Sequence, residues 1–146
     1  MEILNYALVA VVIAIGLILG RVLAWMAKEE IKAGKKYLLI LQKALFCAIT
    51  AVLIYANRTN VHYVWIGGLI IFAYLSFFKK INHLMISAIL GAGLYISSST
   101  DQFLLTSALI FLYGLSAGSL IKDKKLIAGN LAIFLAVALL LFLVLK

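Results

Sequence analysis

Long apolar runs, interrupted at regular intervals by pairs of lysines, constrain this chain more than any other feature of its sequence. The lysine pairs stand at positions 35–36, 79–80 and 124–125, and an apolar run follows each of them. Since 66% of the residues are hydrophobic and only 12% are charged, too little polar surface remains to cover a soluble core. The chain is therefore predicted to fold in lipid, as a polytopic membrane protein.

The apolar runs predict an all-α integral membrane bundle, with about six transmembrane helices in one domain over residues 1–146. Windows of about twenty residues place these helices at 3–26, 37–56, 61–78, 81–97, 103–121 and 126–145. The lysine pairs arrange them as three hairpins in series, each with a lysine turn. Whether this period reflects a true duplication stays open, because helix length and charge placement alone produce much of it.

The basic residues lie almost entirely on one side of the predicted bundle. Those in or beside the first, third and fifth connections are Arg21, Lys28, Lys32, Lys35, Lys36, Lys43, Lys79, Lys80, Lys122, Lys124 and Lys125. Only Arg58 and Lys146 fall on the other side. The positive-inside rule then puts the lysine turns in the cytoplasm and both termini outside, in a multi-pass protein of the cell membrane. The first apolar run has no basic residues before it, so we expect it to be retained rather than removed as a signal peptide.

The positive charge indicates which partners the chain meets. Its formal net charge is +8, and anionic lipid head groups on the cytoplasmic side are the expected partners. The lysines lack the interleaved aromatic residues of a protein that binds single-stranded nucleic acid, so no nucleic acid is expected. A simpler alternative is that the lysines only set the topology.

Small residues predict where the helices approach one another closely. Gly16 and Gly20 form one GxxxG motif, and Gly114 and Gly118 form a second. In lipid, such stripes let two backbones come together, so that dispersion contacts hold the helices. Contacts within one chain and a homo-oligomer interface both agree with this pattern.

Symmetric folding of each hairpin about its turn predicts particular pairs of residues. It places Gly68 opposite Gly91 and Gly118 opposite Gly129. It also sets Asn130 near Gly118, where the amide is expected to hydrogen-bond between helices. These pairs favour contacts within one chain.

Three polar residues in the first two helices form a candidate binding site. Arg21 lies about one turn inside the end of the first helix, and Gln42 and Lys43 lie about two turns inside the start of the second. One hypothesis is a polar pocket that holds a lipid phosphate or another anion, with Arg21 as a forked donor and Lys43 as a point charge. The alternative is that both cations extend along the helix surface to reach the interface.

The sequence offers no recognisable chemistry beyond this site. It contains no catalytic motif, and no cofactor is expected. His62 and His83 fall on opposite sides of the predicted membrane, so no metal site is expected, and Cys47 is interpreted as a packing residue. All five acidic residues lie at helix ends or in connections, which argues against a proton relay at mid-membrane.

One short segment carries a family resemblance. Within residues 20–38, Lys-Glu-Glu-Ile at 28–31 is followed by Gly-Lys-Lys-Tyr at 34–37. This segment resembles the first cytoplasmic segment of small, uncharacterised polytopic membrane proteins of archaea, although Lys28 stands where that segment often has a proline. The resemblance implies a prokaryotic cell membrane and brings no activity with it.

Two classes of function remain. The first is a non-enzymatic membrane protein that acts as a lipid-binding or assembly subunit, which small-residue helix faces and a basic inner face favour. The alternative is a small oligomeric channel or carrier for an uncharged or anionic solute. A carrier is expected to place Ser76, Thr106, Ser116 or Asn130 in a water-lined cavity.

Overall fold

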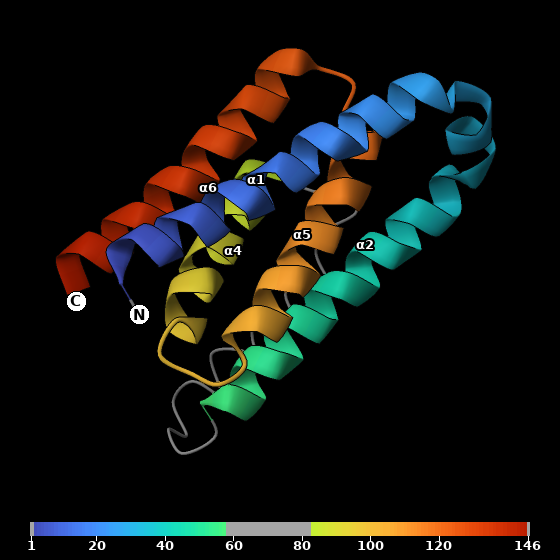
Figure 1. Ribbon diagram of the computed structural model, residues 1–146. Coiled ribbons are helices and arrows are strands. Elements are labelled where there is room, and N and C mark those ends of the chain that lie inside the picture. Colours follow the sequence, from blue (N-terminus) through green and yellow to red (C-terminus); the bar gives the residue numbers. More distant parts are fainter. Residues whose placement is uncertain (1, 58–82, 146) are drawn as a thin grey trace.

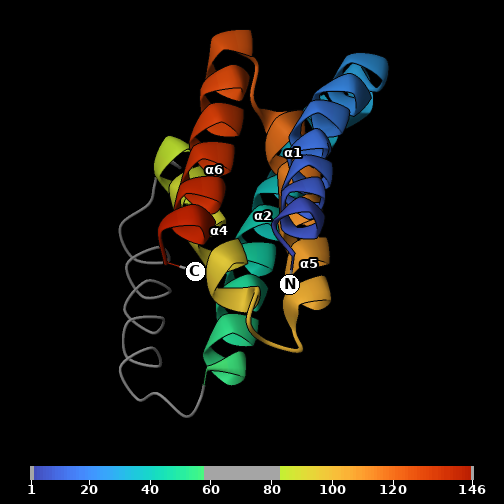
Figure 2. The same ribbon diagram turned by 60° about the vertical axis from the view of Figure 1, so that its left-hand side comes forward.

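The computed structural model describes residues 2–57 and 83–145, which form one bundle of long helices (Figures 1 and 2). These residues contain five helices and no strand: α1 (Ile3–Met26), α2 (Lys28–Ala56), α4 (His83–Ser97), α5 (Phe103–Leu120) and α6 (Lys124–Leu145). Four of the five, all except α4, are long and apolar enough to cross a membrane. The helix expected at 61–78 lies outside the described residues, so the expected number of six helices is not confirmed.

The first helix has the bounds that the sequence predicts, whereas α2 begins at Lys28 instead of residue 37. Only Ala27 separates α1 from α2. The segment 28–36 is rich in Lys and Glu, which favour helix, and Glu29 and Glu30 lie in the first turn, where the helix dipole favours negative charge. With 29 residues, α2 is about 43 Å long, so its charged first turns extend beyond a hydrocarbon core of about 30 Å.

The five described helices pack mainly with helices that are not their neighbours in sequence. α1 packs chiefly along α5, α4 packs along α6, and α2 lies against α5. In Figure 1 both termini lie at one end of the bundle, and the α1–α2 and α5–α6 connections lie toward the other. The expected series of three hairpins, each held by contacts between its own two helices, is therefore not confirmed.

The contact between α1 and α5 is built on four glycines, Gly16, Gly20, Gly114 and Gly118, which we call the glycine seam. A Cβ atom on Gly20 would collide with the carbonyl oxygen of Leu115, and one on Gly118 would collide with that of Leu17. At Gly16 a Cβ would lie 2.8 Å from the carbonyl oxygen of Phe111. The two backbones thus approach so closely that no side chain fits between them.

The structure corrects the glycine pairs that hairpin symmetry predicts. Gly118 faces Leu17 of α1 and not Gly129, whose Cβ would instead lie 3.3 Å from the side chain of Leu84 in α4. Gly91 faces α6, where a Cβ would lie 2.8 Å from the carbonyl oxygen of Phe134. The reason is the order of packing: α5 turns its glycines toward α1, and α6 lies beside α4. The predicted partner of Gly91, Gly68, lies outside the described residues.

Candidate functional site

Arg21 lies where the glycine seam ends. Its Nη1 atom donates a hydrogen bond to the carbonyl oxygen of Ile121 at 3.1 Å, and Ile121 is the C-cap residue of α5. The last carbonyls of a helix have no partner within the helix and carry partial negative charge, so a guanidinium is stabilised there. Because Gly20 precedes Arg21 and packs on α5, the seam holds this cation against the end of α5.

A cavity of about 600 Å³ opens beside Arg21, between the α1–α2 junction and the end of α5. Five cationic side chains line it, and we call it the basic cavity: Arg21, Lys28, Lys32, Lys35 and Lys122. The remaining lining residues are mainly apolar: Ala24, Trp25, Ile31, Ser119 and Leu120. No carboxylate lines the cavity among the residues that the structure describes.

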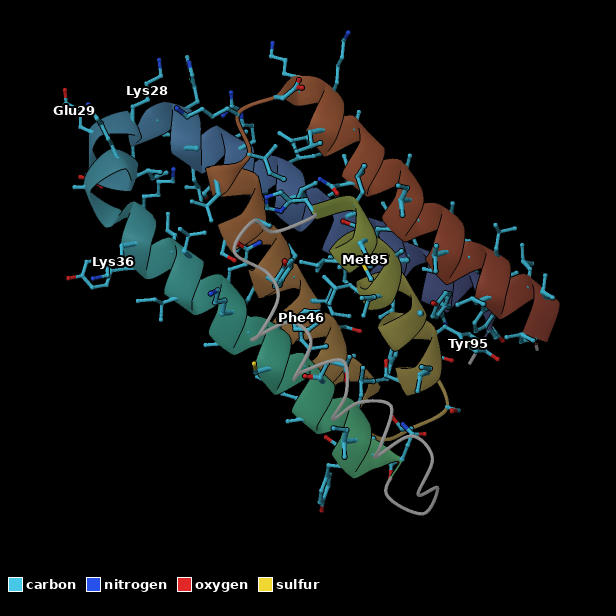
Figure 3. All side chains as sticks on the ribbon, turned by 180° about the vertical axis from the view of Figure 1, so that it is seen from behind. Lys28, Glu29, Lys36, Phe46, Met85 and Tyr95 are labelled. Atoms are coloured by element: carbon cyan, nitrogen blue, oxygen red, sulfur yellow. The ribbon has the colours of Figure 1, made fainter. Side chains whose placement is uncertain are left out.

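Helical spacing gathers the lysines of α2 on one wall. Lys28, Lys32 and Lys35 follow one another at intervals of four and three residues, which places them on the same face of a helix. Figure 3 shows Lys28 and Glu29 at the start of α2, at the end of the bundle remote from Tyr95. This spacing is visible in the sequence, but the sequence predicted a connection here and not a helix, so it did not indicate that these three lysines line one cavity.

The structure separates the three residues of the predicted anion site. Arg21 lines the basic cavity, whereas Gln42 is fully buried and its Nε2 donates to the hydroxyl of Tyr113 at 2.9 Å. Lys43 is half-buried and does not line the cavity. Gln42 therefore joins α2 to α5 inside the bundle, and the cations that accompany Arg21 come from the start of α2 and from Lys122.

A second, smaller cavity of about 40 Å³ lies among α1, α4, α5 and α6, and we call it the polar chamber. Its polar lining side chains are His83, Ser87, Tyr113 and Asn130. Ser87 Oγ donates to Asn130 Oδ1 at 3.0 Å, while the buried Asn130 Nδ2 has no hydrogen-bond partner among residues 2–57 and 83–145. The volume and this amide suit about three water molecules.

Asn130 does bridge two helices, but its partner differs from the expected one. It bonds to Ser87 of α4, because α6 packs beside α4 and not along the length of α5. We expect Ser87→Ala to leave Asn130 Oδ1 without its protein partner and to lower the free energy of unfolding by about 1 kcal/mol. Unfolding in mixed micelles measures this loss, and the exposed Ser99→Ala serves as control. Equal values for the two variants would show that the Ser87–Asn130 bond contributes nothing.

Among the described residues, no group of three or more His, Cys, Asp or Glu side chains could hold a metal ion. Comparison of the chain with protein-family models, with curated proteins and with solved structures finds no match. A proposal for the function therefore has to begin from the chemistry of the basic cavity.

Proposed function

We propose that this chain is a non-enzymatic multi-pass membrane protein that binds anionic lipid head groups, as a lipid-binding or assembly subunit. The observation that carries the proposal is the basic cavity, where five cations converge and no described carboxylate lines the wall. An anion entering such a site meets charge-assisted hydrogen-bond donors and relieves the repulsion among the cations. Basic pockets at the ends of membrane helices are suited to lipid phosphates.

The position of the cavity favours a lipid as the ligand. Lys28, Lys32 and Lys35 lie in the charged first turns of α2, Lys122 lies in the connection after α5, and Arg21 lies about one turn inside the end of α1. Trp25 lines the cavity and is 71% exposed, as is typical of aromatic residues at the level of the head groups. Under the positive-inside rule this end faces the cytoplasm, and both termini face outward, in the cell membrane.

The two GxxxG motifs are proposed to hold one chain together. Both contribute to the contact between α1 and α5, where the close approach of the backbones uses their glycine faces. A homo-oligomer, if formed, would then use another surface. This arrangement favours a compact subunit in which the basic cavity stays accessible to lipid.

The channel or carrier alternative receives less support. Ser116 donates to the carbonyl oxygen of Tyr113 in its own helix at 2.9 Å, and Thr106 is fully buried and lines neither described cavity. Ser76 lies outside the described residues. Asn130 does line a cavity, but about 40 Å³ admits a few water molecules and not a solute pathway.

Replacing the lysines on the α2 wall tests the proposal. We expect Lys28→Gln, Lys32→Gln and Lys35→Gln together to weaken retention of a singly charged anionic lipid about 100-fold, since each cation contributes about 1 kcal/mol. Native mass spectrometry of the gently solubilised protein, with this lipid and a zwitterionic lipid added in equal amounts, measures the retention and also the stoichiometry of the protein.

Lys36→Gln, Lys124→Gln and Lys125→Gln together form the matched control, because these lysines are exposed near the same end but do not line the cavity. The control is expected to retain the lipid like the original chain. If both triple variants lose the lipid equally, diffuse surface charge explains the binding. If the original chain does not distinguish the anionic lipid from the zwitterionic one, the proposed function is wrong.

A further inference from the structure

We infer that the basic cavity is specific for a head group with two phosphate groups, in preference to a head group with one. This inference rests on the proposed function and names the ligand class of the same site. Its starting point is the number of charges: five cationic side chains share one cavity. A single phosphodiester brings one negative charge and leaves most of that positive charge uncompensated, whereas a second phosphate in the same ligand adds a further counter-charge.

The cations are distributed in two groups that can each hold one phosphate. Lys28, Lys32 and Lys35 belong to the α2 wall, and Arg21 and Lys122 lie on the side of α1 and the end of α5. Lysines three and four residues apart on one helix face repel one another. A phosphate between them removes that repulsion, and this gain is separate from the gain at Arg21.

Arg21 has further N–H donors that can bind the second phosphate. One of its five N–H donors is used by the carbonyl oxygen of Ile121, so the guanidinium is held in place while its other donors remain for a ligand. Ser119, by contrast, donates its hydroxyl hydrogen toward the carbonyl oxygens of Gly20 and Leu115, at 3.0 and 2.9 Å. The positioning of the second phosphate thus falls to Arg21 and Lys122.

The size and the apolar lining of the cavity agree with a large lipid head group. About 600 Å³ lies within the range of about 300–1,000 Å³ that is typical of small-molecule sites. Trp25 and Ile31 line the cavity, and the neighbouring Met26 is 72% exposed. Acyl chains can continue from the head group along this apolar surface, which a soluble diphosphate would leave uncovered.

The test is a competition among three lipids, read by native mass spectrometry of the purified full chain. The lipids are a bisphosphate lipid with two phosphodiester groups, a lipid with one phosphodiester and a glycerol head group, and a zwitterionic lipid. We expect the bisphosphate lipid to be retained at least about tenfold better than the singly charged lipid at equal total lipid charge. Lys122→Gln, at an exposed position, is expected to remove most of this preference and to leave retention of the singly charged lipid nearly unchanged.

Inorganic pyrophosphate distinguishes a lipid ligand from a soluble one. We expect it to displace the bisphosphate lipid only at high concentration. We expect Trp25→Ala to weaken retention of the lipid while leaving the affinity for pyrophosphate itself unchanged, so that less pyrophosphate displaces the lipid. If pyrophosphate binds as well as the lipid, and Trp25→Ala has no effect, the lipid assignment is wrong.

The results that would overturn the specificity for two phosphates differ from those that would overturn the proposed function. Equal retention of the two anionic lipids, with both retained above the zwitterionic lipid, would overturn the specificity for two phosphates and leave the proposed function intact. A preference that survives Lys122→Gln unchanged would overturn the assignment of the second phosphate to this side of the cavity. Lys124→Gln, at an exposed position on α6 outside the cavity, is expected to behave like the original chain and serves as the matched control.

Discussion

Gly20→Ala is expected to lower the free energy of unfolding by about 3 kcal/mol. A Cβ atom at this position would collide with the carbonyl oxygen of Leu115. Since that oxygen belongs to the backbone of α5, it cannot move away as a flexible side chain would, and the two helices must separate along the seam. Gly118→Ala has the same expected effect, because its Cβ would collide with the carbonyl oxygen of Leu17. Unfolding of the purified variants in mixed micelles, followed by circular dichroism, measures both losses.

Gly34→Ala is the matched control, and its effect is expected to have the opposite sign. A Cβ on Gly34 would meet no described atom within 4 Å apart from its own stretch of α2, and the residue lies inside α2. Alanine favours helix over glycine by about 0.5–1 kcal/mol, so this variant should be slightly more stable. If Gly20→Ala and Gly34→Ala both changed stability only slightly and in the same direction, the close contact of α1 with α5 would be wrong.

The glycine seam also connects packing with the basic cavity. A Cβ on Gly118 would lie 3.2 Å from the backbone nitrogen of Arg21. Separation of α1 from α5 would therefore move Arg21 away from the carbonyl oxygen of Ile121. We expect Gly118→Ala to weaken lipid retention as well as stability. Gly91→Ala, at the contact of α4 with α6, should reduce stability and leave lipid retention unchanged.

Hydropathy predicts where these helices are, but not where their polar extensions end. The bounds of α1 follow from one apolar run, and α5 ends at Leu120, one residue before the end expected for it. Helix α2 continues through the charged segment 28–36, because Lys and Glu have high helix propensity although they are not apolar. The wall of the basic cavity arises in this segment, and so a search for apolar runs could identify Arg21 but not its lysine partners.

The spacing of the small residues indicates a packing face but not the helix that meets it. Gly114 and Gly118 share a face of α5 whatever their partner, because they are four residues apart. The choice of α1 as that partner depends on how the helices are arranged in space, and packing between helices that are consecutive in the sequence is only one possible arrangement. The same limitation explains Asn130: an asparagine inside the membrane predicts a hydrogen bond between helices, and the order of packing decides that its donor is Ser87.

Tyr6→Ala is expected to lower the free energy of unfolding by about 3–5 kcal/mol. Tyr6 is fully buried, and its ring stacks on that of Phe142 with 4.2 Å between centroids and 12° between planes. A second ring, that of Phe103, lies 6.2 Å away, and the Tyr6 hydroxyl donates to the carbonyl oxygen of Ala138 at 3.2 Å. One side chain thus joins α1 to α5 and α6, and its removal leaves a cavity among three helices.

Tyr6→Phe separates the ring from the hydroxyl: it keeps the stacked rings and should cost only about 1 kcal/mol for the lost hydrogen bond. The same unfolding measurement compares the two variants, and losses of equal size would mean that the rings contribute little. Tyr6 and Arg21 lie 15 residues apart on α1, or about 22 Å along the helix. Tyr6→Phe, which retains the packing, should therefore leave the lipid preference of the basic cavity unchanged. A changed preference in this variant would show that the two ends of α1 act together, and that the cavity depends on more than the glycine seam beside it.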